Sequence, residues 1–436
     1  MYAKRRQRLL SKLGDGLLIL PTAPHSIRNG DVHYSFRPGS DLHYLTGFGE
    51  PDTVLVAWRK GKNSHRSVLF VPPRDKTRET WDGPRAGVRG AMKKHGVDEA
   101  YPVNELWLRL PELLEGHQRV FHTLFADEKF DARLREVFGK FAMKHRRGNP
   151  PAHPGIVDPR PALAELRLIK DAAEIALMEE AARISVRGHV RAMAGARAGM
   201  HEYEVQAIVE SEFRSQGSRR NGYDSIVASG ANACILHYIN NDRKIRRDEL
   251  LLIDAGAEFQ QYTADITRTF PVSGTFTDSQ RAVYNAVLVA QKAGINAVKP
   301  GAPWDAPHKT CTRVLTRELK KIGLLRGDLK KLVAKGACRK WFMHGTTHWL
   351  GMDVHDVGTY EDEKGKPARF RAGMVLTVEP GLYFNRDDKS VPPSFRGIGI
   401  RIEDDVLVTR TGRRVLTAAV PKEIRDVEAA CNANGI

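Results

Sequence analysis

From about residue 171 onward, the sequence runs twice through the same order of secondary-structure elements. Capping-box pairs, Asp171 with Glu174 and Thr277 with Gln280, mark where the first helix of each pass begins. Apolar periodicity in the first pass predicts helices at 171–194 and 201–216 and strands at 224–230, 249–259 and 262–272. The second pass has predicted helices at 277–298 and 304–322 and strands at 374–384 and 397–409. The repeat predicts two structurally similar halves with a site between them.

A proline-rich segment precedes this repeat. Residues 147–166, RGNPPAHPGIVDPRPALAEL, hold five prolines in twenty positions. Because proline fixes φ and lacks a backbone N–H, we expect a connector there. The part before it alternates strand-like and helix-like pieces, beginning with a strand at Leu17–Leu20. A chain of 436 residues can bury two cores, so the sequence predicts an α+β protein with two domains, 1–160 and 161–436.

Composition favours a globular protein of a reducing compartment. Hydrophobic residues make up 41% and charged residues 28%, an ordinary balance for soluble domains. No apolar run approaches the roughly 20 residues that cross a bilayer. Ser11, Lys12 and Asp15 interrupt the apolar start of the chain, so we expect neither a membrane span nor a signal peptide. No C-x-x-C pair occurs among the cysteines, which favours the cytoplasm; they are Cys234, Cys311, Cys338 and Cys431.

The formal net charge of +17 allows two interpretations. A dense basic patch binds nucleic acid by releasing counterions, whereas scattered basic residues form a solvated surface. The basic clusters, such as 4–8, 144–147 and 243–247, are spread along the chain and lack interleaved aromatic residues that could stack on bases. The second interpretation is favoured, and we expect no nucleic-acid partner.

Two aspartates follow one another on predicted strands. Asp254 ends the apolar run LLLID, and Asp265 comes eleven residues later, beyond a predicted turn at Gln260–Gln261. A strand hairpin would bring the two carboxylates together, and buried carboxylates need a partner. The residues alone leave three possibilities open: a shared metal, an arginine partner such as Arg268, or a solvated sheet edge.

Two glutamates extend this pattern. Glu379 ends the apolar run MVLTVE before a Pro–Gly turn, and Glu403 lies in GIGIRIEDD, where it shares one strand face with Arg401 and Asp405. A site with all four carboxylates would carry four negative charges, which two divalent cations would neutralise. Carboxylates with one imidazole suit Mn²⁺, and also Co²⁺, Zn²⁺ or Fe²⁺. The imidazole can come from the stretch MHGTTHWLGMDVHDVG, which offers three histidines: His344, His348 and His355.

In this order and at these spacings, the segments IDAG, ADITRTF, HGTTHWLGMDVHDVG, VEPG and GIRIEDD resemble the metal-binding set of the pita-bread metallopeptidases. The segments RNGDVHYSFRPGSDLHYLTGF (28–48) and ETWDG (79–83) resemble the amino-terminal domain of the aminopeptidase P branch of that family. The resemblance covers nearly the whole chain. It implies a carboxy-terminal pita-bread domain and a smaller α/β amino-terminal domain.

The resemblance also implies a centre of two Mn²⁺ ions. Asp254 would chelate one ion, while Asp265 and Glu403 would bridge both. His348 and Glu379 would complete the shell of the other ion, and a hydroxide would bridge the two. Glu379 would also serve as the general base.

Other residues are implied to handle the substrate. His355 would stabilise the oxyanion, His237 would lie over the scissile bond, and His344 would line the pocket for the residue after that bond. Arg401 would hold the ligand carboxylates, and Tyr383 would form a hydrogen bond near the site. From the residues alone, His237 and Tyr383 also fit buried core positions.

Two residues of the first domain complete the implied site. Asp31, in RNGDV, matches a position that lies near the free amino group of the substrate and is reached from a neighbouring subunit. Trp81 would contribute to the pocket across the same interface. Both imply a homo-oligomer, a tetramer or a dimer. For Asp31, an exposed loop aspartate is the alternative.

The implied reaction is hydrolysis of the bond between an amino-terminal residue and a following proline, with the peptide as partner. Proline lacks an N–H and forms a tertiary amide, which excludes most peptidases. Prolidase, which shares the metal set and cleaves only dipeptides, is the alternative, and methionine aminopeptidase fits less well. A non-catalytic pita-bread protein that binds nucleic acid or protein is a remote alternative, because this chain keeps all five ligand types.

Overall fold

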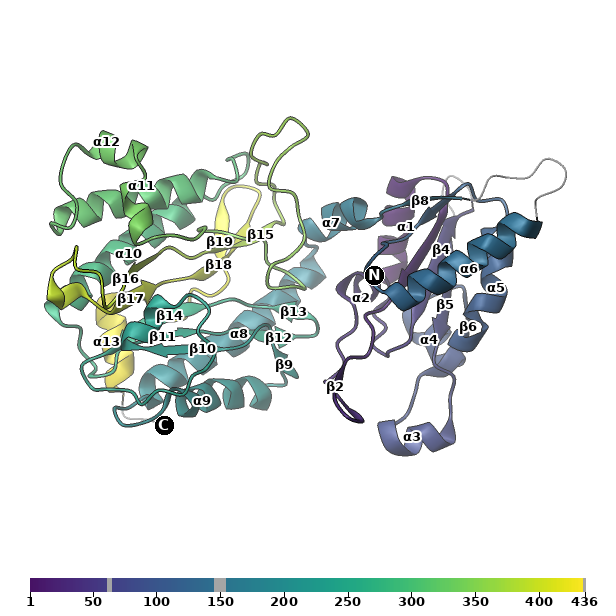
Figure 1. Ribbon diagram of the computed structural model, residues 1–436, viewed down its shortest axis with the longest axis horizontal. Coiled ribbons are helices and arrows are strands. Elements are labelled where there is room, and N and C mark those ends of the chain that lie inside the picture. The colour runs from purple at the N-terminus through teal and green to yellow at the C-terminus, as the bar shows by residue number, and fades with distance from the viewer. Residues whose placement is uncertain (61–64, 145–153, 434–436) are drawn as a thin grey trace. The chain divides into compact units, whose positions relative to one another are not determined.

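The computed structural model describes residues 1–60, 65–144 and 154–433. Its chain divides into two compact units, Met1–Leu166 and Arg167–Ile436 (Figure 1). The helix α7 (Arg160–Leu168) crosses this division, and the expected boundary at 160/161 falls at its first residue. That boundary between domains remains a prediction.

The expected connector is only partly irregular. Residues 145–153 lie outside the described residues. The remainder forms a short strand, β8 (Gly155–Val157), followed by α7, so the predicted connector contains short regular elements. Pro161 stands at the start of α7, where the missing N–H of proline costs no helical hydrogen bond.

The first unit is built around a six-stranded mixed sheet in the order β6-β5-β4-β1-β7-β8. Its other strands are β1 (Leu17–Pro21), β4 (Val54–Arg59), β5 (His65–Val71), β6 (Glu99–Pro102) and β7 (Arg119–Phe121), with a small hairpin of β2 (Ile27–Asn29) and β3 (Val32–His33). Its helices are α1 (Tyr2–Leu13), α2 (Ser40–Thr46), α3 (Lys76–Asp82), α4 (Gly87–His95), η1 (Val103–Glu105), α5 (Leu106–Leu114) and α6 (Glu128–Lys144). Leu17 and Ile19 pack with α5 and α6, and α1 and α4 also contact the sheet. Successive residues of β1 are therefore buried on alternate faces, which explains its unbroken apolar sequence.

The second unit repeats the order of elements that the sequence predicts. Its first half comprises α8 (Ala172–Gly195), α9 (Glu202–Ser215), β9 (Arg220–Asn221), β10 (Ile226–Ser229), η2 (Gly230–Cys234), β11 (Leu250–Asp254), β12 (Ala257–Phe259), β13 (Tyr262–Thr263) and β14 (Thr267–Pro271). Its second half comprises α10 (Asp278–Ala297), α11 (Ala306–Lys321), α12 (Leu329–Ala334), η3 (Ala337–Lys340), β15 (Val375–Val378), β16 (Gly381–Phe384), η4 (Pro393–Phe395), β17 (Ile398–Arg401), β18 (Asp404–Val408), β19 (Arg413–Val415) and α13 (Ile424–Asn432). Figure 1 shows the strands of this unit between the helix pairs α8–α9 and α10–α11.

Both predicted capping boxes are present. The Asp171 side chain accepts from the backbone N–H of Glu174, whose side chain accepts from Asp171 N in return. Thr277 and Gln280 form the same reciprocal pair at the start of α10. Among the helices that the structure describes, none combines the length and apolarity needed to cross a membrane.

Each of the four long apolar runs in the two halves of the second unit forms two strands, not one. The runs 249–259 and 262–272 form β11 and β12, and β13 and β14, and within each run the two strands belong to different sheets. The runs 374–384 and 397–409 break in the same way. At Gly256, between β11 and β12, an added Cβ would lie 1.8 Å from Ala264 O. Only glycine therefore lets the two backbone segments pass this close to each other. Asp254 ends β11, and the other predicted carboxylates lie between strands: Asp265, Glu379 and Glu403.

The two halves meet where β14 contacts β17. Glu403 N donates to Thr267 O at 3.1 Å. Thr269 Oγ1 donates to Arg401 O at 3.0 Å. These bonds bring the broken strands of one half beside those of the other, so side chains from both reach a common space.

Candidate active site

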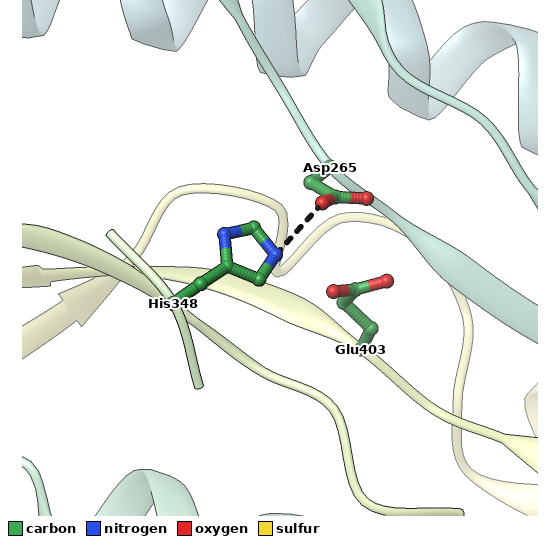
Figure 2. A group of neighbouring side chains, drawn as sticks. All are labelled: Asp265, His348 and Glu403. Carbon is green, nitrogen blue, oxygen red and sulfur yellow. Dashed lines mark ion pairs between the residues drawn. The ribbon is translucent and has the colours of Figure 1, made fainter. Parts of the chain in front are cut away.

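Three predicted metal ligands meet at the strand breaks of the second unit. One ligand atom each from Asp265, His348 and Glu403 lies within 4.8 Å of the others. Figure 2 shows these three side chains pointing toward one another. His348 Nε2 is 3.3 Å from Asp265 Oδ2, and both carboxylates are buried. The spacing allows one cation to contact all three groups.

The other two predicted ligands line the same cavity, whose volume is about 460 Å³. Glu379 Oε1 is 3.6 Å from His348 Nε2. Asp254 is connected to Asp265 through the hydroxyl of Tyr223. The cavity is also lined by the predicted substrate residues of this unit, apart from Tyr383: His237, His344, His355 and Arg401.

Burial and mutual repulsion oppose the negative charge of this cluster. Burial raises the pKa of Glu379 to about 7. Burial, followed by the charge of Asp265, raises the pKa of Glu403 well above its ordinary value, and burial also raises the pKa of Asp254. Burial acts on Asp265 in the same direction, but the hydrogen bond from His348 and nearby positive charges together lower its pKa. The cluster therefore favours added positive charge, and its carboxylate and imidazole donors fit divalent cations.

Tyr223 is a site residue that the sequence reasoning missed. Its hydroxyl lies 2.6 Å from both Asp254 Oδ1 and Asp265 Oδ1. A hydroxyl has one hydrogen to donate, so Tyr223 donates to one of these two carboxylates at a time. Burial raises the pKa of Tyr223 well above its ordinary value, so the group stays a hydroxyl. Nothing in the local sequence NGYDS distinguishes this residue from a core tyrosine.

Arg401 forms an ion pair with one ligand and reaches another through a hydroxyl. Its Nη2 is 2.5 Å from Asp254 Oδ2. Its Nε donates to Thr267 Oγ1 at 3.0 Å, and that hydroxyl donates to Glu403 Oε2 at 2.7 Å. The expectation that Arg401, Glu403 and Asp405 share one strand face is wrong, because the strand breaks between β17 and β18.

The arginine considered as an alternative partner of the aspartates lies elsewhere. Arg268 Nη2 is 2.8 Å from Asp404 Oδ1, and both side chains are fully buried. Lys422 Nζ is 2.6 Å from the other oxygen of Asp404. Arg268 therefore neutralises Asp404, so it is not the partner of Asp254 or Asp265 that one of the three alternatives required.

His344 belongs to a directed chain of hydrogen bonds. Arg401 Nη1 donates to the Tyr383 hydroxyl at 3.1 Å, and this hydroxyl is 2.8 Å from His344 Nε2. His344 Nδ1 is 2.6 Å from Gly345 O, which can only accept. The ring is therefore protonated at Nδ1, and its Nε2 accepts from Tyr383. Burial lowers the pKa of His344 to about 3, which keeps the ring neutral.

His355 lies against His348, in a segment anchored by buried ion pairs. The two rings are T-shaped, with centroids 4.5 Å apart. The next residue, Asp356, is buried and lies 2.6 Å from Arg167 Nη2 and 2.9 Å from Lys170 Nζ. His355 itself stays exposed at the cavity.

The remaining predicted residues divide between the two units. His237 is exposed at the cavity, so its interpretation as a core histidine is wrong. Tyr383 is buried and also forms the hydrogen bonds described above. Asp31 and Trp81 belong to the first unit, Asp31 in the turn between β2 and β3 and Trp81 in α3, and both are exposed. Neither lines the cavity of the second unit.

Comparison with known proteins connects this geometry to a family. Residues 176–410 match metallopeptidase family M24, and residues 2–121 match the aminopeptidase P, N-terminal domain. This chain belongs to metallopeptidase family M24. It is 41% identical over 432 residues to the Xaa-Pro aminopeptidase of Haemophilus influenzae, which covers 99% of this chain and 97% of that protein.

Solved structures of similar proteins superpose on nearly the whole chain. Aminopeptidase PepP of Pseudomonas aeruginosa superposes with a TM-score of 0.96 at 44% identity, covering 99% of this chain and 98% of that one. Zinc-substituted Escherichia coli aminopeptidase P, in complex with product, gives 0.95 at 41% identity, with the same coverage. The predicted fold class, a pita-bread unit with an aminopeptidase P amino-terminal domain, is confirmed.

Proposed function

We propose that this metallopeptidase removes the amino-terminal residue from peptides whose second residue is proline, using two divalent cations. One observation carries the proposal: a single cavity of the M24 unit gathers four carboxylates and an imidazole whose environment favours added positive charge. Relatives named Xaa-Pro aminopeptidase, 41% identical over nearly the full chain, support the substrate class. The proposed ligands are Asp254, Asp265, His348, Glu379 and Glu403.

The proposed cations are Mn²⁺, with Co²⁺, Zn²⁺ or Fe²⁺ as alternatives that the same donors accept. Bound there, they would lower the pKa of a water molecule and polarise the peptide carbonyl. The four cysteines are free thiols, which supports the expectation of a reducing compartment such as the cytoplasm.

Glu379 is the proposed general base, because its carboxylate faces both the ligand cluster and the pocket. Its Oε1 is 3.6 Å from His348 Nε2, and its Oε2 is 3.7 Å from His344 Nδ1. The carboxylate takes a proton from the attacking water and delivers it to the proline nitrogen when the peptide bond breaks.

The histidines of the pocket have different proposed tasks. Both nitrogens of His344 are engaged, by Gly345 O and the Tyr383 hydroxyl, so the ring packs against substrate and transfers no proton. His355 donates a hydrogen bond to the developing oxyanion, and His237 lies over the scissile bond. Arg401 and Tyr383 hold Asp254 and His344 in place.

Apolar side chains in the same cavity suit the proline ring and the amino-terminal side chain. They are Ile226, Leu236, Ile239 and Val354. A mostly apolar wall with a few convergent polar groups is the usual form of a small-ligand site.

Asp31 and Trp81 are proposed to reach the site of a neighbouring subunit in a homo-oligomer. Trp81 is 83% exposed, and so large an apolar side chain is rarely left in water. Sedimentation and the kinetics of Asp31→Asn and Trp81→Ala test this. We expect an oligomer and a raised KM in both variants; a fully active monomer would contradict the proposal.

The decisive experiment removes metal with a chelator, restores one cation at a time, and assays an Xaa-Pro-Xaa tripeptide beside an Xaa-Pro dipeptide. We expect no activity without metal, best recovery with Mn²⁺, and cleavage of the tripeptide. Cleavage of the dipeptide alone would identify a prolidase instead. Glu379→Ala should abolish turnover while the fold survives, and a near-normal rate would remove Glu379 from the mechanism.

A further inference from the structure

A buried carboxylate outside the metal centre gathers the donors of one segment of the pocket wall. Glu202, the first residue of α9, is fully buried. Its Oε1 accepts from Ser229 N at 2.6 Å, Ser229 Oγ at 2.7 Å and Asn232 Nδ2 at 3.2 Å. Its Oε2 accepts from the Tyr238 hydroxyl at 2.8 Å and from Arg243 N at 3.0 Å. All five donors belong to residues 229–243.

This segment, which we call the 229–243 loop, forms part of the cavity wall. Apart from Ser229, which ends β10, and η2, it contains no helix or strand. Leu236, His237 and Ile239 line the cavity, whereas Tyr238 between them is buried and points to Glu202. Because Tyr238 stands directly between His237 and Ile239 in the chain, the bond to its hydroxyl restrains the backbone from which both cavity-lining side chains project.

The far end of the loop has a separate anchor. Asn241 Oδ1 accepts from Val227 N at 2.9 Å. Asn241 Nδ2 donates to Gln206 Oε1 at 2.9 Å and to Ser225 O at 2.8 Å. Asn241 therefore holds the end of the loop independently of Glu202, whose bonds reach Asn232 and Tyr238 in its middle.

We propose that Glu202 is a positioning residue for catalysis: it sets the place of His237 and Ile239 against the substrate without touching the substrate. The inference rests on the proposed function, which assigns His237 to the scissile bond. It requires a carboxylate, because only a group that accepts on both oxygens can satisfy both sets of donors. A glutamine at this position would turn an NH₂ group toward one set, where the backbone N–H of Ser229 or Arg243 would then lack an acceptor.

Two variants release the loop to different extents, and the chain offers a matched control. Glu202→Gln leaves the backbone N–H of either Ser229 or Arg243 without its acceptor, because these groups can only donate. Tyr238→Phe removes one hydroxyl, which donates to Glu202 and also lies 3.1 Å from Asp242 Oδ1. Glu204 stands in the same helical turn, is exposed, and accepts from His201 N in the capping box of α9. Glu204→Gln keeps an acceptor for His201 N and removes no hydrogen bond to the 229–243 loop.

With the Mn²⁺-loaded enzyme and an Xaa-Pro-Xaa peptide, we expect kcat/KM to fall about 10- to 100-fold in Glu202→Gln, as for a displaced substrate-positioning group. The fall in Tyr238→Phe should be smaller, about three- to tenfold. Glu204→Gln should stay within about twofold of the parent, as surface substitutions do. Bound Mn²⁺ should be unchanged in all three, and amide hydrogen exchange should rise within the 229–243 loop of Glu202→Gln alone.

Epistasis with His237 decides between positioning and a general structural effect. If Glu202 acts through His237, Glu202→Gln should lower kcat/KM much less in the His237→Ala background than in the parent enzyme. If the fold-losses in kcat/KM of the two single variants multiply fully in the double variant, the inference is wrong. It is also wrong if Glu202→Gln and Tyr238→Phe both keep the parental rate. Either outcome leaves the proposed function intact. A parental rate in His237→Ala overturns the proposed role of His237 and the inference with it.

Discussion

Replacing Tyr223 with phenylalanine removes one hydroxyl from the candidate metal centre and leaves the buried ring in place. That hydroxyl lies 2.6 Å from Asp254 Oδ1 and 2.6 Å from Asp265 Oδ1. Because it carries a single hydrogen, the substitution deletes one hydrogen bond to a charged group. Such a bond contributes about 1.5–3 kcal/mol.

The loss should appear in metal binding, because the hydroxyl fixes oxygens of two proposed ligands. Deleting a group that orients a ligand lowers metal affinity about 10- to 100-fold. At about 1.4 kcal/mol for each factor of ten, this corresponds to about 1.4–2.8 kcal/mol, in agreement with the value of the bond. We expect the Kd for Mn²⁺ to rise about 10- to 100-fold in Tyr223→Phe. The rate at saturating Mn²⁺ should stay within about fivefold of the parent, because the hydroxyl bonds to the proposed ligands Asp254 and Asp265.

Competition with a chelator of known affinity measures this Kd in the metal-free parent and its variants. Tyr262→Phe is the matched control, because the Tyr262 hydroxyl donates to the buried carboxylate of Glu174 at 2.8 Å and does not line the cavity. The control should lose stability and keep its affinity for Mn²⁺. Parental Mn²⁺ affinity in Tyr223→Phe would refute the reasoning, as would equal losses of affinity in the two variants.

Three further predictions concern stability and the division of labour among the histidines. Burial lowers the pKa of His189 to about 4, so stability that is complete above the unfolded-state value of 6.5 should fall by about 3 kcal/mol as the pH drops from 6.5 to 4. His189→Gln should flatten that slope in urea unfolding at several pH values, and an unchanged slope would exclude His189 as its cause. Asp356→Asn breaks buried ion pairs and should cost about 3–5 kcal/mol of unfolding free energy, against less than about 1 kcal/mol for the half-exposed Asp353→Asn; equal small losses would contradict this. His348→Ala should lose bound Mn²⁺, whereas His344→Ala should keep Mn²⁺ and lose turnover; metal analysis that finds both variants depleted would refute the distinction.

Features that depend on local sequence could be predicted. The capping boxes at Asp171 and Thr277 follow from hydrogen bonds between residues three positions apart, so they are visible in the chain itself. The proposed ligand carboxylates stood out because each follows or interrupts an apolar run, where an unpaired charge is costly. Their gathering in one cavity agrees with that reasoning.

Features that depend on contacts between residues distant in sequence could not be predicted from the sequence. Hydrophobic runs show that a segment is buried, but not that its strand leaves one sheet and joins another. Only the break after Glu379 was visible in the sequence, through the Pro380–Gly381 turn. Tyr223 lies 31 and 42 positions from the two aspartates it contacts. The pairing of Arg268 with Asp404 spans 136 positions. No periodicity carries such information, because the contacts form only once the two halves pack together.

The strand breaks explain how one cavity can hold so much negative charge. In a continuous strand only every second side chain points to a given face, and ladder bonds fix the backbone. Where the strands break, the carboxylates that lie between strands instead have separate backbone hydrogen bonds. Glu379 N donates to Thr346 O at 2.9 Å, and Asp265 N donates to Asp405 Oδ2 at 3.1 Å. The chain can therefore turn carboxylates from several strands toward one point.

Those carboxylates come equally from the two halves of the second unit. Asp254 and Asp265 follow the first helix pair, and Glu379 and Glu403 follow the second. Their repulsion opposes the contact between the halves, while apolar packing shared by helices and strands of both halves favours it. A cation bound to ligands of both halves would turn that repulsion into attraction, so metal affinity and the cohesion of the unit should depend on the same side chains.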